Sequence, residues 1–115
     1  MRIVGKNVEI TNAMWEYATM KIYRLIRYPA IDNIDNAHMK VEIHPEHHKV
    51  SLTVPGIRHD FHAEAVATDY YAAVNEVIDK IKDQARREKT ELYDSGKREQ
   101  DDHFEPDEAE YDEDE

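Results

Sequence analysis

The sequence contains no cysteine, and only three of its 115 residues are glycine. The lack of cysteine excludes a disulfide framework and thiolate chemistry and is compatible with a reducing compartment. So few glycines leave no phosphate-binding loop and no dinucleotide-binding fingerprint, and the G-x-S-x-G motif of serine hydrolases is also absent. No apolar run approaches the roughly 20 residues of a membrane helix, and the first ten residues do not resemble a secretory signal. The sequence predicts a soluble cytoplasmic protein.

Charge is distributed unevenly along the chain. Residues 99–115, "EQDDHFEPDEAEYDEDE", contain 11 of the 26 acidic residues and no Lys or Arg. The other 15 acidic residues are balanced by all 15 Lys and Arg, so residues 1–98 are formally neutral although the chain carries −11. Acidic runs without hydrophobic periodicity are typical of disorder. We therefore expect one small domain over residues 1–93 and a disordered acidic tail over residues 94–115.

The N-terminal part predicts a strand followed by a helix. Residues 2–10 are rich in Ile and Val and predict a strand that is irregular at Gly5. Thr11 supplies an N-cap hydroxyl, and Pro29 ends the helical pattern, so the predicted helix covers residues 12–28. Its apolar residues form one stripe at helical spacing: Met14, Ala18, Ile22, Leu25 and Ile26.

Three short alternating segments follow, at residues 38–44, 49–54 and 59–66. Period two with breaks at residues 45–47 and 55–56 predicts an antiparallel meander with one buried face. The other face is polar and carries Lys40, Glu42, His44, Lys49, Ser51 and Thr53.

A second helix is predicted from Thr68 and Asp69 to about Tyr93. Its apolar stripe consists of Tyr71, Val74, Ile78, Ile81, Ala85 and Leu92. Of the adjacent Tyr70 and Tyr71, one is expected in the core and the other as a lid over the helix start. The predicted fold is α+β with the order β-α-β-β-β-α, in which two helices pack on one face of a four-stranded sheet.

Basic residues line one flank of each predicted helix. On the first helix these are Lys21, Arg24 and Arg27; on the second they are Lys82, Arg86 and Lys89, with Lys80 and Arg87 further out. Because both helices cover the same sheet face, the flanks can border one shared phosphate-binding groove. The alternative is a pair of ordinary solvated helix faces, partly offset by Asp79, Asp83 and Glu88.

The segment "HPEHH" at residues 44–48 is the candidate for a metal site. His44, Glu46, His47 and His48 are residue types that bind zinc, but a hairpin turn would separate His47 from His48, and no CxxC or HExxH spacing is present. A solvated turn without metal or cofactor is therefore expected. No carboxylate lies in an evident apolar pocket that would raise its pKa, so the chain is not expected to be an enzyme.

Two motifs resemble a known family. Residues 5–14, "GKNVEITNAM", resemble the opening of the ribosome hibernation factors, roughly G-[KR]-N-x-E-[IV]-T-x-A. Residues 68–81, "TDYYAAVNEVIDKI", resemble their second-helix signature, and the resemblance extends from residue 2 to about 93. It implies a stationary-phase or stress translation inhibitor on the small ribosomal subunit, in the channel for mRNA and tRNA. Such a protein is expected to bind rRNA, but neither DNA nor membranes, and to be a monomer when free.

The resemblance also implies which residues contact rRNA. Seven match positions that are usually basic in the family: Lys6, Lys21, Arg24, Arg27, Lys80, Arg86 and Arg87; Lys82 and Lys89 complete the predicted rRNA-binding set. Three residues depart from the family pattern, namely Asp83 in place of Arg, Ala85 in place of Leu and Tyr70 in place of Met. Affinity is expected to be weaker near Asp83, where Lys82 is the neighbouring cation.

Short members of this family form two branches. One ends soon after the second helix and promotes ribosome pairing. The other, the ribosome-associated inhibitor (protein Y), has an acidic extension and keeps ribosomes as single inactive particles, and the present tail is similar to it. A pairing-promoting factor remains the alternative, and a protein-interaction module without RNA is a rival of another class. Double-stranded RNA-binding domains share the α-β-β-β-α order, but their last helix begins with a basic cluster, and here no basic residue precedes Lys80.

Overall fold

A computed structural model describes residues 1–93, with side chains through residue 88. The acidic segment 94–115, predicted to be disordered, lies outside the described residues. The elements are β1 (Arg2–Lys6), α1 (Asn12–Tyr23), the 3₁₀ helices η1 (Arg24–Arg27) and η2 (Ile34–Asn36), β2 (His38–Ile43), β3 (His48–Val54), β4 (Phe61–Ala67) and α2 (Tyr70–Tyr93). The predicted class and the order β-α-β-β-β-α are confirmed.

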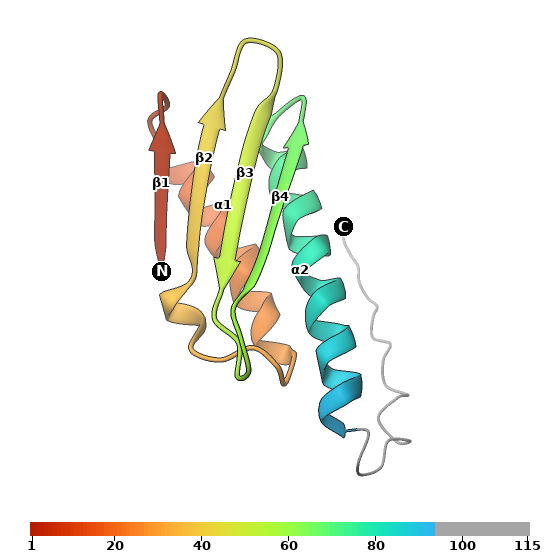
Figure 1. The fold of residues 1–115 in the computed structure, drawn as a ribbon. Helices are drawn as coiled ribbons and strands as arrows, with labels where there is room; N and C mark the ends of the chain where they lie inside the picture. The colour runs from red at the N-terminus through yellow and green to blue at the C-terminus, as the bar shows by residue number, and fades with distance from the viewer. Residues whose placement is uncertain (94–115) are drawn as a thin grey trace.

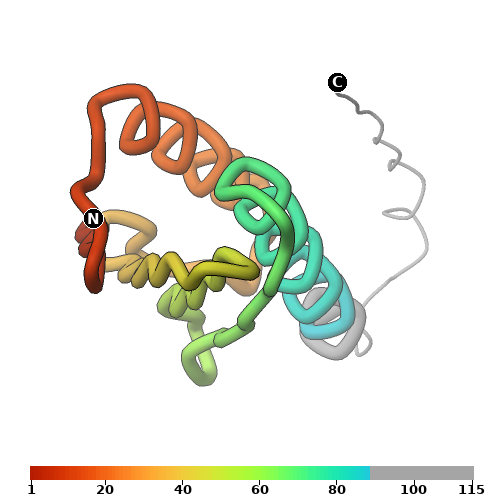
Figure 2. The backbone as a smooth tube through the Cα atoms, turned by 90° about the horizontal axis from the view of Figure 1, so that it is seen from above, coloured from red at the N-terminus to blue at the C-terminus, as the bar shows by residue number. Residues whose placement is uncertain are grey.

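The four strands form one sheet in the order β1-β2-β3-β4. β1 runs parallel to β2, with Arg2 opposite His38, whereas β2, β3 and β4 form the predicted antiparallel meander. Alternation along the strands buries one face, on which Met39, Val41 and Leu52 are fully inaccessible to solvent. Both helices cover this face, behind the sheet in Figure 1 and as a single layer above it in Figure 2.

β1 is shorter than predicted. Asn7 has a φ of 63°, in the left-handed region, which turns the chain out of the sheet directly after Lys6. The following residues fold back against the strand, and a Cβ on Gly5 would lie 2.3 Å from the carbonyl oxygen of Val8. Residues 7–10 are therefore a return segment that requires glycine at position 5, and the prediction that they continue the strand is wrong.

Helix α1 is also shorter than predicted, because the chain tightens into η1 after Tyr23. A 3₁₀ turn has three residues instead of 3.6, so positions after the change rotate relative to the α-helical stripe. Leu25 remains fully buried, but Ile26 is 61% exposed. The predicted place of Ile26 in the core stripe is wrong for this reason.

The two tyrosines at the start of α2 have different environments. Asp69 accepts a hydrogen bond from the backbone N–H of Ala72 at 2.9 Å and so fixes where the helix begins. Tyr70 then aligns with Val74 and Val77 on the buried stripe and is 4% exposed, whereas Tyr71 is 41% exposed. Tyr71 was predicted in the stripe, and the structure corrects this; Val74, Ile78, Ile81 and Ala85 are buried as predicted. The side chain of Leu92 lies outside the described residues.

Candidate nucleic-acid interface

Two hydrogen bonds fix α1 against α2. The Tyr17 hydroxyl donates to Oδ1 of Asn75 at 2.9 Å, and the Tyr70 hydroxyl donates to the carbonyl oxygen of Met14 at 2.8 Å. Since Met14 contacts residue 70 and Tyr17 contacts residue 75, the helices run in the same direction. Their C-terminal halves therefore lie at the same end of the domain, as Figure 1 shows.

Basic side chains follow the interhelical contact on both helices. Lys21 and Arg24 lie one and two turns after Tyr17, and Arg27 lies one 3₁₀ turn after Arg24. On α2, Lys82 and Arg86 lie about two and three turns after Asn75 and so occupy the flank that faces α1. We call Lys21, Arg24, Arg27, Lys82 and Arg86 the interhelical basic surface. These are five of the nine residues predicted to bind rRNA.

Three cations of this surface lie close to groups on their own helices. The Lys21 ammonium lies 5.5 Å from the centre of the Tyr17 ring. Lys82 lies 3.6 Å from an oxygen of Asp79, and Arg86 lies 3.3 Å from one of Asp83. Exposed ion pairs one turn apart on a helix contribute little to stability, so a phosphate oxygen can replace the carboxylate at low cost.

The remaining predicted residues lie elsewhere. Lys80 Nζ donates to the carbonyl oxygen of Glu64 at 2.7 Å, and Gln84 Nε2 donates to that of His62 at 2.9 Å, so this flank of α2 runs along β4. Arg87 lies two turns after Lys80 on the same flank. Lys6 ends β1 at the opposite edge of the sheet, and the side chain of Lys89 is outside the described residues.

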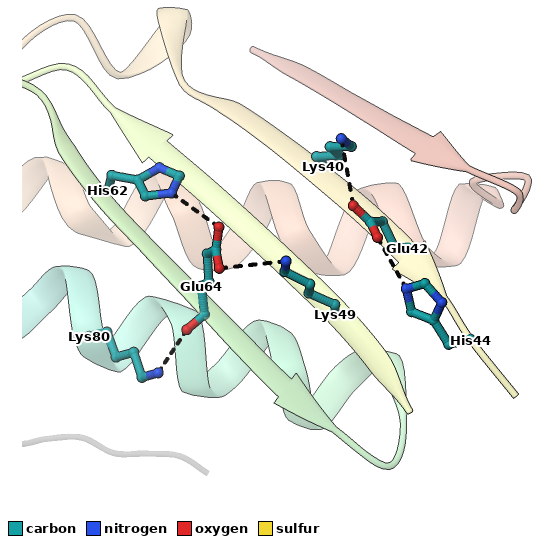
Figure 3. Close-up of polar contacts among 7 residues, drawn as sticks. All are labelled: Lys40, Glu42, His44, Lys49, His62, Glu64 and Lys80. Carbon is teal, nitrogen blue, oxygen red and sulfur yellow. Dashed lines mark hydrogen bonds and ion pairs between the residues drawn. The ribbon is translucent and has the colours of Figure 1, made fainter. Parts of the chain in front are cut away.

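The outer sheet face is polar as predicted, and its charges are paired (Figure 3). Glu42 lies 3.5 Å from Lys40 and 3.1 Å from His44. Glu64 lies 3.6 Å from both Lys49 and His62. The hydrogen bond from His44, followed by the nearby lysines, lowers the pKa of Glu42. Because carboxylates lie among its cations, this face is a weaker candidate for phosphate than the interhelical basic surface.

Glu88 is not part of the basic flank, contrary to expectation. It is 8% exposed, and its carboxylate oxygens lie 3.2 Å from Arg58 and 3.4 Å from His59. Both cations belong to the loop between β3 and β4. A hydrogen bond with the Asp60 backbone, together with the charge of Glu88, raises the pKa of His59. Hydrophobic periodicity in the sequence does not reveal a buried, paired carboxylate of this kind. Here its ion pairs hold the loop against α2.

The His-rich turn shows no metal-binding arrangement. His44 and His47 exchange backbone hydrogen bonds of 2.8 and 3.3 Å across a tight hairpin, and their rings lie 4.8 Å apart. Within residues 1–93, no three His, Asp or Glu side chains are grouped so that they could hold a metal ion. Over the same described residues, no helix combines the length and the apolar character needed to cross a bilayer.

Tyr70 provides a test of the interhelical contact. Burial raises its pKa to about 12, above the value near 10 of an unfolded tyrosine. The resulting stabilisation is complete below pH 10 and is lost as the pH rises through 12. We expect Tyr70→Phe to remove the last-ionising tyrosine from an alkaline absorbance titration. We also expect it to lower stability by about 1 kcal/mol, because the hydrogen bond from α2 to the Met14 carbonyl is lost. The exposed neighbour offers the control. Tyr71→Phe removes a charge that helps to raise the pKa of Tyr70 but keeps the burial that raises it most, so a late ionisation should remain.

Comparison with known proteins places the chain in a family. The model of the family described as "Sigma 54 modulation protein / S30EA ribosomal protein" matches residues 1–93. The chain belongs to this family. The ribosome hibernation promoting factor of Escherichia coli (strain K12) is similar to this chain. It is 33% identical over 92 residues, which cover 80% of this chain and 95% of the relative. The predicted family is therefore confirmed.

A further relative and two solved structures are similar to this chain. The ribosome hibernation promoting factor of Klebsiella oxytoca is 35% identical over 94 residues, covering 80% of this chain and 95% of the relative. The crystal structure of the Thermus thermophilus Protein Y N-terminal domain superposes with a TM-score of 0.65 and 26% identity, covering 75% and 93% of the two chains. A ribosomal subunit interface protein from Coxiella burnetii, with a TM-score of 0.64, 23% identity and coverage of 78% and 99%, shares the fold.

Proposed function

We propose that this protein binds the small ribosomal subunit and keeps ribosomes inactive as a translation inhibitor of stationary phase or stress. The observation that carries the proposal is the interhelical basic surface, where cations of two parallel helices lie at one end of a rigid domain. Relatives named ribosome hibernation promoting factors, which this chain matches over almost their whole length, support it. The protein would act in the cytoplasm as a monomer, without cofactor, membrane or DNA.

The proposed mechanism is electrostatic and steric. Lysine and arginine side chains displace counterions from rRNA phosphates, and arginine can hold two phosphate oxygens at once. The domain then occupies space that mRNA and tRNA need in the channel of the small subunit. The interhelical basic surface provides the main contact, while Lys6, Lys80, Arg87 and Lys89 would reach rRNA from other sides of the domain. No covalent bond is made or broken.

Such a protein could keep inactive ribosomes either as unpaired particles or as pairs. The acidic segment over residues 94–115 supports the branch that keeps ribosomes as unpaired particles. The alternative is a factor that favours ribosome pairing. Ribosome profiles recorded with the full chain and with residues 99–115 deleted separate the two. Paired particles that form only after the deletion support the first, and pairing by the full chain supports the second.

Binding to small subunits is expected to weaken steeply with salt. For five phosphate contacts, a fourfold rise in monovalent salt should lower the affinity about 100- to 500-fold. Co-sedimentation of the purified protein with small subunits through sucrose gradients of increasing salt measures this loss.

A flat response over the same salt range would contradict phosphate contact. A protein that remained at the top of the gradient at the lowest salt would instead favour the rival, an interaction module that does not bind RNA. The gradient therefore distinguishes binding through phosphate contacts from salt-independent binding and from the absence of binding.

A further inference from the structure

Tyr71 is an exposed aromatic side chain on the flank of α2 that faces α1. The residue is 41% exposed, yet its ring makes two edge-to-face contacts. One is to Tyr17 of α1, at 4.9 Å and 84°, and the other is to Tyr70, at 5.1 Å and 81°. Such contacts favour one orientation of the ring. The surface therefore presents a flat apolar side chain whose position is fixed before any ligand binds.

An amide and a cation lie near this ring. The Tyr17 hydroxyl donates to Oδ1 of Asn75, and this orients the Asn75 amide so that its NH₂ group supplies the remaining donors. The Lys21 ammonium lies 5.5 Å from the centre of the Tyr17 ring. An aromatic ring, an amide donor and a cation thus gather within about one helical turn of the interhelical contact.

We propose that Tyr71, Asn75 and Lys21 form a subsite for an unpaired nucleotide of RNA. The base stacks on Tyr71, the Asn75 amide donates to an acceptor on the base edge, and Lys21 contacts a neighbouring phosphate. Bases within a duplex have both faces covered by their neighbours, so only a single-stranded or looped segment can use this ring. The inference rests on the proposed function and names the class of RNA that this surface takes.

The surroundings favour a nucleotide over a partner helix. A helix would need an apolar groove that continues for several turns. Along this flank Tyr71 is followed one turn later by Asn75 and two turns later by Asp79, which pairs with Lys82. One aromatic ring followed by donors and charges fits a base with its phosphate.

Tyr23 provides a matched comparison on the same domain. It is also 41% exposed, but its hydroxyl donates to a carboxylate oxygen of Asp35 at 2.6 Å. That contact lies on η2, away from α2, and its negative charge disfavours phosphate. Among the side chains described, through residue 88, two tyrosines are thus largely exposed, and the combination with a cation and an amide donor is found at Tyr71.

The test measures binding of the full chain to fluorescently labelled single-stranded RNA and to a duplex of the same composition. Tyr71→Ala should weaken single-strand binding about 5- to 150-fold without changing its salt dependence. Tyr71→Phe should bind like the wild type, because the stacking surface remains. Tyr23→Ala should leave the affinity unchanged, and duplex binding should not respond to either alanine variant. Asn75→Asp still accepts the Tyr17 hydrogen bond but loses the donors, so about a tenfold loss is expected even if Tyr71→Ala folds poorly.

The outcomes show whether the subsite alone fails or whether the proposed function fails with it. If Tyr71→Ala and Asn75→Asp bind single-stranded RNA like the wild type while Arg24→Glu with Arg86→Glu removes binding, the subsite is overturned and the phosphate surface stands. Equal losses for Tyr71→Ala and Tyr23→Ala, or on single strand and duplex, also overturn it. If neither the charge reversals nor the Tyr71 variants change binding, both proposals fail.

Discussion

Replacing Arg24 and Arg86 together with glutamate is expected to abolish co-sedimentation with the small ribosomal subunit. Each substitution removes one of the proposed charged hydrogen bonds to phosphate and introduces a repelling charge on one side of the interhelical basic surface. Two lost contacts of this kind should lower the affinity at least about 100-fold. Both side chains are exposed and neither belongs to the core, so the far-UV circular dichroism spectrum should be unchanged.

A charge-matched control distinguishes an effect of the interhelical basic surface from an effect of the protein's net charge. Arg2→Glu with Lys40→Glu changes the net charge by the same amount on the outer sheet face, away from both helices. This variant should still sediment with small subunits at low salt. If both double variants lost binding equally, net charge rather than the interhelical basic surface would control the interaction.

Ile81→Ala is expected to destabilise the domain by about 2–5 kcal/mol. Ile81 is fully inaccessible on the buried stripe of α2, which packs over β3 and β4. Truncation leaves a cavity under the helix that supplies two of the five residues of the interhelical basic surface. Because small domains have a total stability of roughly 5–15 kcal/mol, this is a large fraction of it. Urea unfolding followed by circular dichroism should show a lower midpoint with an unchanged slope.

The control for this substitution is an isoleucine with the opposite environment. Ile57 lies in the loop between β3 and β4 and is 60% exposed, so Ile57→Ala should change stability by less than about 0.5 kcal/mol. A similar midpoint for both variants would mean that α2 contributes far less to the core than its burial indicates.

The sheet and the helix types were predictable because their signals are local. Alternation places Val50, Leu52 and Val54 on one face whichever partner covers it, and the structure buries all three. Spacing of three or four residues likewise grouped Lys21 with Arg24 and Lys82 with Arg86. Each grouping depends on the geometry of a single helix.

The features that were mispredicted depend on contacts between elements or on small backbone changes. The switch to η1 moved Ile26 to the surface, and the left-handed Asn7 ended β1 early. Which tyrosine enters the core depended on the residue at which α2 begins. The hydrogen bond between Tyr17 and Asn75 depends on how the two helices are aligned, and no spacing within either helix encodes that alignment.

Lys80 and Gln84 have a consequence for self-association. β4 is an edge strand, and the outward carbonyl groups of such a strand are sites where another chain can add by backbone pairing. Here the carbonyl oxygens of His62 and Glu64 already accept hydrogen bonds from these two side chains. A foreign strand would have to displace both before it could extend the sheet at this edge. The same helix that carries two of the five residues of the proposed RNA surface thus protects the domain against strand-to-strand aggregation.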